Sequence, residues 1–373
     1  MNRFDLTYAT VDSLSEGVGS SQIVPLIEKF AANGMKINLI TFEKEGPSAS
    51  LDDRMTRSGV VWSQLPFGDS GPLGGVNRTI RLAREMTYSD ITHARSDFPA
   101  VAARISGQNR ILWDVRSLWA DQRKFMEKNQ LKKSMYGMYG PFESLACNSA
   151  IALSTLTNAI VPVLLDRHKK LPQLRTVVPT AVDLDKFMFS PNMPRKIKGL
   201  YSGTYNNYYD LELSRKFIEA IRRIEDCRVD WAKPKESQVK SLHGGENSSF
   251  SLTQPEMASI MSEYSFGISI CKDNAGLSLK AAMPTKIAEF LAIGRPLVVN
   301  AGLGDCDEII EKYAVGVVIR STDDLNAKAS EFLDLCKDPD TPIKCRTVAE
   351  SLFSLDNGVS NYLRTYAEML RNL

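Results

Sequence analysis

The stretch from Pro284 to Asn300 has the residue types and spacing needed to bind an anion. Pro284 stands where a helix would begin and Gly294 where it would end, because proline suits the first helical turn and glycine the stop. The amides at such a helix N-terminus attract a phosphate, and Lys286 would add a positive charge there. Glu289 lies partway along the helix and could accept hydrogen bonds from a ribose diol. We therefore expect a diphosphate-bearing ligand here; the alternative is an amphipathic helix with solvated Lys286 and Glu289.

Two neighbouring stretches extend this candidate site. Lys280 could lie near the same helix N-terminus, so that a diphosphate would pair with both lysines. The segment Ala301–Asp305 contains two glycines before a further helix, which would give backbone amides a second approach to the ligand.

A second candidate site is the loop Asp12–Gln22, which follows the first apolar strand. Gly17 and Gly19 would let backbone amides approach a ligand, and the next helix N-terminus adds partial positive charge. A dinucleotide-binding fingerprint would have glycine where Gln22 stands, although Glu43 ends the second strand as a ribose-binding acid does. Phosphate binding, dinucleotide binding and a plain turn that needs glycine for its backbone angles stay open.

Charged side chains occur at the ends of two other apolar strands. Asp114 and Arg116 end one of them, and His93 ends another, followed by Arg95. Open α/β folds place ligands at the carboxyl ends of their strands, which makes these residues candidates for catalysis. The alternatives are an ion pair that ties down a loop and a hydrogen-bonded structural histidine.

The segment Lys124–Tyr139 interleaves lysines with apolar residues. It could form a surface helix that contacts an anionic membrane or a lipid-linked acceptor. The alternative is an ordinary helix whose apolar face packs on the core while its lysines reach water.

Strand-like and helix-like segments alternate in both halves of the chain, which predicts two α/β domains with parallel sheets. The strands expected in the first half are Phe4–Val11, Lys36–Phe42, Val60–Leu65, Asp90–Ala94, Ile111–Val115, Ala150–Leu153 and Thr176–Val178. Those expected in the second half are Gly199–Ser202, Arg228–Trp231, Phe266–Ile270, Leu297–Asn300 and Gly316–Ile319. The helices expected there are Leu211–Ile224, Pro255–Tyr264, Thr285–Ile293, Asp307–Tyr313 and Leu325–Cys336.

The expected domains are 1–187 and 199–354, joined by a proline-containing linker at 188–198. A C-terminal helix within 355–373 would pack back on the first domain. A helix is expected over Ser20–Asn33, capped by Ser20 or Ser21, and a mobile loop over Lys235–Thr253.

The 373 residues, with 24% charged and 43% hydrophobic, fit a globular protein of two domains. The net charge of +2 gives no reason to expect nucleic acid as a partner. The six cysteines are scattered, without a C-x-x-C pair, so we expect reduced thiols in a cytoplasmic protein and no metal site. The N-terminus lacks a signal peptide, and no stretch approaches the ~20 apolar residues of a membrane span. Peripheral membrane contact stays open.

Taken together, the motifs resemble glycosyltransferase family four, retaining enzymes of the GT-B fold, over nearly the whole chain. The loop Gly17–Gln22 is similar to the family's glycine-rich acceptor-side loop. Val178–Phe187 resembles its I-P-N-G-V-D-x-x-x-F crossover between domains, and Tyr201–Thr204 its first C-domain strand and glycine turn. Trp113–Gln122 resembles a bacterial sub-group with a D-x-R-x-x-W string, often tied to surface polysaccharide or specialised glycoside synthesis.

The resemblance implies an α/β GT-B fold, with two Rossmann-like domains facing across a cleft. It implies transfer of a sugar from a nucleoside diphosphate sugar to an acceptor hydroxyl, with retention at the anomeric carbon and without a metal or other cofactor. The acceptor would be a glycan, a lipid-linked sugar or a small molecule. The implied catalytic residues are His93, Asp114 and Arg116. The implied donor-binding residues are Gly17, Gly19, Gly203, Thr204, Lys280, Thr285, Lys286 and Glu289, and the acceptor-side residues are Ser20, Arg95 and Trp119.

The sequence departs from the family pattern in three places. Ala281 replaces the first of two glutamates, and Arg116 replaces an N-domain histidine. The turn after Gly203 lacks the usual Arg and Lys that bind the diphosphate, so Lys280 or Lys286 is expected to share that work. The alternatives are a non-catalytic nucleotide-sugar-binding partner subunit, a nucleotide-sugar epimerase and a dinucleotide-dependent oxidoreductase.

Overall fold

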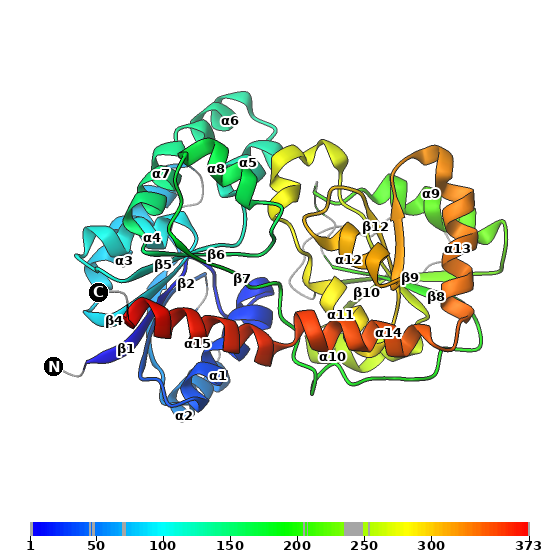
Figure 1. Cartoon of the computed structure of the whole chain (residues 1–373), viewed down its shortest axis with the longest axis horizontal. Coiled ribbons are helices and arrows are strands. Elements are labelled where there is room, and N and C mark those ends of the chain that lie inside the picture. The colour runs from blue at the N-terminus through cyan, green and yellow to red at the C-terminus, as the bar shows by residue number, and fades with distance from the viewer. Residues whose placement is uncertain are drawn as a thin grey trace. The chain divides into compact units, whose positions relative to one another are not determined.

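The computed structural model describes residues 3–44, 46, 49–68, 72–203, 206, 208–234, 249–252 and 254–371. The chain divides into two compact units (Figure 1), Met1–Val178 with Gly358–Leu373, and Pro179–Asn357. The segment 188–198 therefore lies inside the second unit, and most of the C-terminal helix belongs to the first.

Within the described residues, the first unit contains a parallel sheet with the strand order β3-β2-β1-β4-β5-β6-β7. Its strands are β1 (Phe4–Ala9), β2 (Ile37–Glu43), β3 (Val61–Pro66), β4 (Ser89–Arg95), β5 (Ile111–Val115), β6 (Ala152–Thr155) and β7 (Leu174–Val177). Its helices are α1 (Val24–Ala32), α2 (Ala49–Arg57), α3 (Pro72–Glu85), α4 (Asp97–Ile105), α5 (Trp119–Met126), α6 (Gln130–Gly137), α7 (Gly140–Ser149), α8 (Val161–His168) and most of α15 (Leu355–Arg371).

The described part of the second unit repeats this plan, with the order β10-β9-β8-β11-β12-β13. Its strands are β8 (Lys198–Ser202), β9 (Arg228–Pro234), β10 (Ser249–Leu252), β11 (Phe266–Ser269), β12 (Leu297–Asn300) and β13 (Gly316–Ile319). Its helices are α9 (Leu211–Arg222), α10 (Gln254–Ile260), α11 (Thr285–Ile293), α12 (Cys306–Lys312), α13 (Leu325–Lys337) and α14 (Thr341–Val348).

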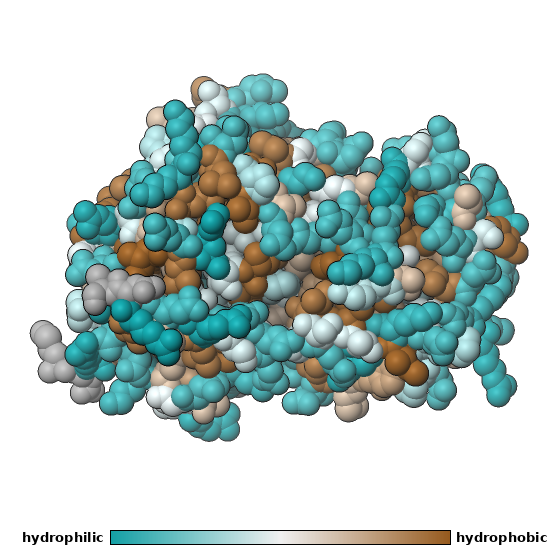
Figure 2. Space-filling model, in the orientation of Figure 1, coloured by the Kyte–Doolittle hydropathy of each residue, from teal (hydrophilic) through white to brown (hydrophobic). Residues whose placement is uncertain are grey.

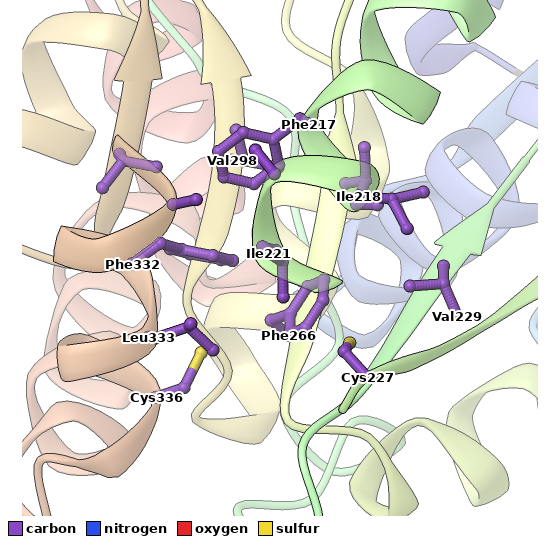
Figure 3. Packing of buried hydrophobic residues seen from close by; sticks show 14 of the residues in the cluster. Phe217, Ile218, Ile221, Cys227, Val229, Phe266, Val298, Phe332, Leu333 and Cys336 are labelled. Atoms are coloured by element: carbon purple, nitrogen blue, oxygen red, sulfur yellow. The ribbon is translucent and has the colours of Figure 1, made fainter. Parts of the chain in front are cut away.

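The core of the second unit lies between α9, α13 and one face of the sheet. Phe217 and Ile221 of α9 face Phe332 of α13 and Phe266 of β11 (Figure 3), all almost fully buried. On the other face α11 packs closely, because a Cβ on Gly267 would lie 2.3 Å from the ring of Phe290. Helices on both faces leave the ends of the strands as the place for a ligand.

Each sheet has a switch point, where the strand order reverses between two central strands. In the first unit it lies between β1 and β4, and in the second between β8 and β11. The crevice at the carboxyl ends of such a pair is where open α/β sheets bind ligands. Both candidate sites therefore follow the carboxyl ends of central strands, as the sequence analysis expects.

Three expected elements need correction. The loop expected over Lys235–Thr253 contains β10, which pairs with β9; residues 235–248 and 253 lie outside the described part. A single helix is expected over Lys124–Tyr139, but the structure has two. α5 ends at Met126, and Asn129 caps α6 because its Oδ1 accepts a hydrogen bond from Lys132 N. The third, the serine cap of the first helix, is described with the glycine loop below. In the described part of the chain, no helix is long and apolar enough to cross a membrane.

Candidate functional site

The site in the second unit is built around the start of α11. Pro284 has extended backbone angles (φ −58°, ψ 132°), and the helix begins with Thr285, the first turn closing where Ile287 N donates to Pro284 O. Gly294 ends the helix with φ 92°. The boundaries expected from the sequence are confirmed. The helix dipole gives the N-terminus of α11 a partial positive charge.

Lys286, the second residue of α11, is buried without a conventional partner. Its side chain is only 4% exposed, and among the described residues Nζ has no hydrogen-bond partner. The ammonium instead lies 4.7 Å from the ring centroid of Tyr201 and 4.1 Å from that of Tyr209. A cation held only by two aromatic faces retains its three N–H donors for a ligand.

Burial changes the proton affinity of this lysine. Loss of solvent lowers the pKa of Lys286 to about 8, although nearby Cys271 and Glu289 act in the opposite direction. An anion bound at Nζ would replace the lost solvation and favour the charged form. The amine is thus suited to bind a diphosphate near neutral pH.

Gly203 makes room for the lysine at the end of β8. Its φ of 119° lies in the region that favours glycine, and a Cβ there would lie 3.0 Å from Lys286 Nζ. Glycine at this position therefore adds no side chain of its own on that side of the ammonium.

Two serines add further donors at the same switch point. Ser202 ends β8 and Ser269 ends β11, both are buried, and neither hydroxyl has a hydrogen-bond partner among the described residues. Phe266 pairs with Gly199 and Gly267 with Leu200. Continuing this register sets Ser269 opposite Ser202, so both side chains are on one face of the sheet. Buried donors without partners are uncommon in proteins and are typical of ligand sites.

The loops beyond β11 and β12 are tied to each other. Asn300 Oδ1 accepts a hydrogen bond from Cys271 N at 2.7 Å, and Asp307 Oδ2 accepts one from Gly302 N at 2.7 Å. The Gly302 amide, expected to approach a ligand, is therefore engaged by Asp307. The glycine-containing segment is a turn that connects β12 to α12.

The other donor-site candidates are placed as follows. Glu289 is half-buried one turn after Lys286, on the same helix. Lys280 is half-buried near the end of the 3-10 segment Asp273–Ala281. Thr204 lies outside the described residues. The structure thus brings Gly203 and Lys286 into direct proximity, with Thr285 and Glu289 on the helix that carries the lysine.

In the first unit, Glu43 holds the loop that follows β1. Its carboxylate accepts hydrogen bonds from Ser13 Oγ (2.5 Å), Leu14 N (3.0 Å), Ser15 Oγ (3.0 Å) and Thr41 Oγ1 (2.7 Å). The side chain is 5% exposed and its oxygens are occupied by this loop. Glu43 therefore organises the loop and is not presented to a ribose, which argues against dinucleotide binding.

The two glycines of this loop serve different needs. Gly17 has φ 52°, and among the described residues a Cβ there would meet no atom within 4 Å. Gly19 packs so tightly that a Cβ would lie 1.8 Å from Ser13 O. The expected serine cap is wrong, because Ser20 Oγ and Ser21 Oγ donate back to Gly17 O at 3.1 and 2.9 Å. Both serines lie inside a π-helical stretch, Gly19–Ile23, that precedes α1. Glycine is needed at position 17 for its positive φ, and at position 19 because the backbone of Ser13 leaves no room for a Cβ.

A fully buried carboxylate, Asp114, lies at the centre of the same unit. Its Oδ1 accepts hydrogen bonds from Ser154 Oγ at 2.8 Å and from Tyr362 OH at 3.2 Å. Its Oδ2 lies 3.1 Å from His93 Nε2, and the other ring nitrogen of His93 lies 2.6 Å from Tyr366 OH. Since the carboxylate accepts, we assign the proton to Nε2, so that Nδ1 accepts from Tyr366.

Two arginines complete this network. Arg95 Nη1 lies 3.7 Å from Asp114 Oδ2, and its Nε donates to Asp12 Oδ2 at 3.1 Å. Arg116 Nη1 lies 3.6 Å from Asp114 Oδ1 and donates to Val178 O and to Tyr362 OH. Burial alone would raise the pKa of Asp114, but the arginines and His93 outweigh it and hold that pKa below its ordinary value. Burial lowers the pKa of His93, so the ring is neutral.

The sequence-based candidates His93, Asp114, Arg116 and Arg95 are therefore one connected group, whose partners include α15. Their catalytic role stays a prediction. Trp119, expected on the acceptor side, packs edge-on against Phe98 with ring centroids 4.8 Å apart.

Several residues of these sites carry no signal in the sequence. Tyr362 and Tyr366 are far from His93 along the chain, and only the return of α15 brings them together. Tyr201, Ser202 and Ser269 are ordinary residues near strand ends, and Tyr209 lies between β8 and α9; only the fold brings the two tyrosines to Lys286 and aligns the two serines.

Searches against protein-family models and against curated proteins find no match for this chain. Solved structures do match it along its whole length. A glycosyltransferase from Rickettsia africae ESF-5 has a TM-score of 0.67 at 16% identity, and covers 100% of both chains. Sucrose-phosphate synthase from Thermosynechococcus elongatus has a TM-score of 0.70 at 12% identity, with 100% of both chains covered. An E. coli structure described as trehalose-6-phosphate bound with UDP-2-fluoro glucose has a TM-score of 0.66 at 10% identity, with 99% of both chains covered. At these identities the likeness shows the fold, and the expected α/β GT-B fold is confirmed.

Proposed function

We propose that the chain is a retaining glycosyltransferase that resembles family four and moves a sugar from a nucleoside diphosphate sugar to an acceptor hydroxyl. The observation that carries this is the buried Lys286 ammonium at the start of α11, which has no hydrogen-bond partner among the described residues. A diphosphate would pair with this ammonium and with the positive end of the helix dipole, and the Ser202 and Ser269 hydroxyls at the ends of β8 and β11 are further donors for it. The fold shared with known glycosyltransferases supports the same assignment.

The proposed reaction breaks the bond between the anomeric carbon and the terminal diphosphate oxygen. The bonding electrons stay on that oxygen, and the acceptor oxygen forms the new bond on the same face of the sugar. The acceptor proton passes to the departing diphosphate, so no separate base is required. Lys286, Ser202 and Ser269 would stabilise the charge that develops on the leaving group, without a metal or other cofactor.

The first donor to test is a UDP-sugar, because one matched structure is described with a UDP-sugar analogue bound. The acceptor would be a glycan, a lipid-linked sugar or a small molecule, in bacterial polysaccharide or specialised glycoside synthesis. In this proposal Gly17 and Gly19 belong to the donor-binding loop of the first unit, and Arg95 and Arg116 act on the acceptor side of the reaction, held by Asp114 and His93.

The test is a thermal-shift panel of UDP, GDP, dTDP, ADP, CMP and NADH, followed by incubation with the matching sugar nucleotides. A ligand at a hundredfold excess over its Kd stabilises the folded state by about 2.7 kcal/mol. A shift with one nucleoside diphosphate, then release of that diphosphate with the product in the donor's anomeric configuration, supports the proposal. A shift with NADH alone would overturn it.

A second candidate is a nucleotide-sugar-binding subunit that does not catalyse transfer by itself. It is favoured by Ala281, which is 1% exposed and occupies the place where the family pattern has its first glutamate. This candidate predicts a thermal shift with the diphosphate but neither transfer nor hydrolysis by the purified chain. An epimerase would instead return a changed sugar nucleotide in the absence of any acceptor.

A further inference from the structure

The segment that joins α5 to α7 has an unusual surface. Leu131 of α6 is 74% exposed and Met138, just after that helix, is 72% exposed. Lys128, Lys132 and Lys133 are exposed beside them. Large apolar side chains are costly to leave in water, so two of them among three lysines call for an explanation.

The core does not account for these residues. Tyr136 and Tyr139 are the residues of this segment that pack inward, in a cluster with Phe98, and Trp119 packs against it. The ring of Tyr139 lies edge-on to those of Phe98 and Trp119. Because the aromatic side chains of the segment pack into the core, Leu131 and Met138 are exposed to solvent. The interpretation that the apolar face of this segment packs on the core is therefore wrong for these two residues.

The neighbouring helix α3 continues the apolar surface. Leu73, Val76 and Ile80 are 75%, 38% and 44% exposed and recur at helical spacing along one side. Helices α3 and α6 are in contact, and a Cβ on Gly75 would lie 3.2 Å from the Tyr139 hydroxyl. Leu73 and Val76 flank Gly75 in the chain, and Met138 precedes Tyr139. Figure 2 shows brown residues among teal ones over the part of the molecule that holds α3 and α5 to α8. We call the five exposed apolar residues and the three lysines the α3–α6 surface.

The charge of this surface is of one sign. From Arg123 to Tyr139 the chain has five basic residues and a single acid, Glu127. Basic side chains beside exposed leucine and methionine suit an anionic lipid layer, where lysines meet headgroups while apolar side chains enter the interface. Nucleic acid would be expected to meet exposed aromatic side chains for stacking, yet Trp119, Tyr136 and Tyr139 point into the core.

We propose that the α3–α6 surface docks this protein on an anionic membrane. Leu131 and Met138 enter the headgroup layer, the exposed apolar residues of the contacting helix α3 add to the docking surface, and the three lysines pair with lipid phosphates. This inference concerns where the protein acts and does not rest on the proposed sugar transfer.

The experiment is co-sedimentation of the whole chain with vesicles, in the absence of any nucleotide. One set contains phosphatidylcholine alone and the other phosphatidylcholine with phosphatidylglycerol. The protein should sediment with the anionic vesicles only and be released by salt. The triple variant Lys128→Glu/Lys132→Glu/Lys133→Glu should bind at least about a hundredfold more weakly, since each lysine near a membrane contributes roughly fivefold. The variant Leu131→Ser/Met138→Ser should also bind more weakly while keeping its charge.

The matched control is Arg195→Glu/Lys196→Glu/Lys312→Glu, which reverses three exposed basic residues of the second unit. It should bind the anionic vesicles as the natural chain does. Circular dichroism and the thermal shift with a nucleoside diphosphate check that each variant is folded, so failure of docking and failure of the proposed function are distinguishable. Protein that stays in the supernatant with both vesicle types overturns the inference. So does binding that both α3–α6 variants leave unchanged, or selective binding of single-stranded RNA in place of vesicles.

Discussion

The ammonium group of Lys286 lies 4.1 Å from the ring centroid of Tyr209 and, among the described residues, has no hydrogen-bond partner. Two aromatic faces compensate only part of the solvation that a buried charge loses. The depressed pKa of about 8 reflects that deficit, which a bound anion would remove. This lysine should therefore destabilise the ligand-free protein and stabilise the complex.

Replacing Lys286 with methionine should stabilise the ligand-free protein at pH 7. The pKa falls from 10.5 to about 8 on folding, a difference that costs about 3 kcal/mol of stability while the group is charged. Methionine fills similar space without the charge, so the free energy of unfolding in urea should rise by about 1–3 kcal/mol. The same variant should lose the thermal shift with the nucleoside diphosphate.

The matched control for this variant is Lys312→Met. That lysine also lies over a tyrosine ring, 5.2 Å from the centroid of Tyr313, but it is exposed at the end of α12. Its replacement should change neither stability nor donor binding appreciably. A methionine at position 286 that leaves donor binding intact would remove the basis for the proposed site.

The affinity for the diphosphate should fall as the pH rises above about 8. The free lysine loses its proton near that pH, whereas the bound anion raises the pKa, so binding takes up a proton. Above pH 8 the Kd should increase about tenfold per pH unit until the pKa of the complex is reached. Calorimetric titration at several pH values in buffers of different ionisation enthalpy measures both the slope and the proton uptake. A Kd that is constant between pH 7 and pH 9.5 contradicts the assignment.

Replacing Gly203 with alanine should weaken donor binding more than its backbone angle alone predicts. The new Cβ would lie 3.0 Å from Lys286 Nζ and push the ammonium from its place. Gly276 is the matched control, since it also has positive φ (61°) but its Cβ would meet no described atom within 4 Å. Both variants should lose about 1–3 kcal/mol of stability from backbone strain. Only Gly203→Ala should raise the Kd, by tenfold or more, as measured by titration.

The sequence predicted α11 to the residue because its boundaries are set locally. Pro284 sets the start and Gly294 the end of the helix by their own backbone preferences, and a run of good helix formers lies between them. The strands β5, β12 and β13 were predicted with equal accuracy, since short buried apolar runs between polar turns have few other conformations. Lys286 was likewise found from the sequence, because its position at a helix N-terminus is a local property.

What the sequence could not predict depends on contacts between distant segments. Nothing local distinguishes a solvated Lys286 from one enclosed by Tyr201 and Tyr209, and only the folded sheet decides it. In the same way Glu43 has the position of a ribose-binding acid but is occupied by the loop at Ser13. β10 was missed because its four residues sit in a polar segment and owe their conformation to pairing with β9.

Glu43→Gln should loosen the loop after β1. The amide keeps the size of the side chain but replaces one acceptor oxygen with a donor, which then faces the hydrogens of the loop. We expect a loss of about 1–3 kcal/mol in unfolding free energy, and a KM for the donor that rises more than kcat falls. Glu43→Asp, which keeps two acceptors, should recover part of the loss. An unchanged KM would show that the loop does not contribute to donor binding.

The hydrogen-bond network that joins α15 to the strands of the first unit can be tested at Tyr366 and Asp114. Tyr366→Phe removes the donor to His93 Nδ1 and should cost about 1 kcal/mol in urea unfolding. Asp114→Asn leaves Arg95 and Arg116 without their shared buried carboxylate and should cost about 3–5 kcal/mol.

Because the folded-state pKa values of Asp114 and His93 are both lowered, the unfolded chain binds more protons, and the natural protein should lose stability as the pH falls below about 6.5. Hydrogen exchange should show residues 358–371 losing protection first in the Asp114 variant, and unchanged protection there would mean that the network does not anchor the helix.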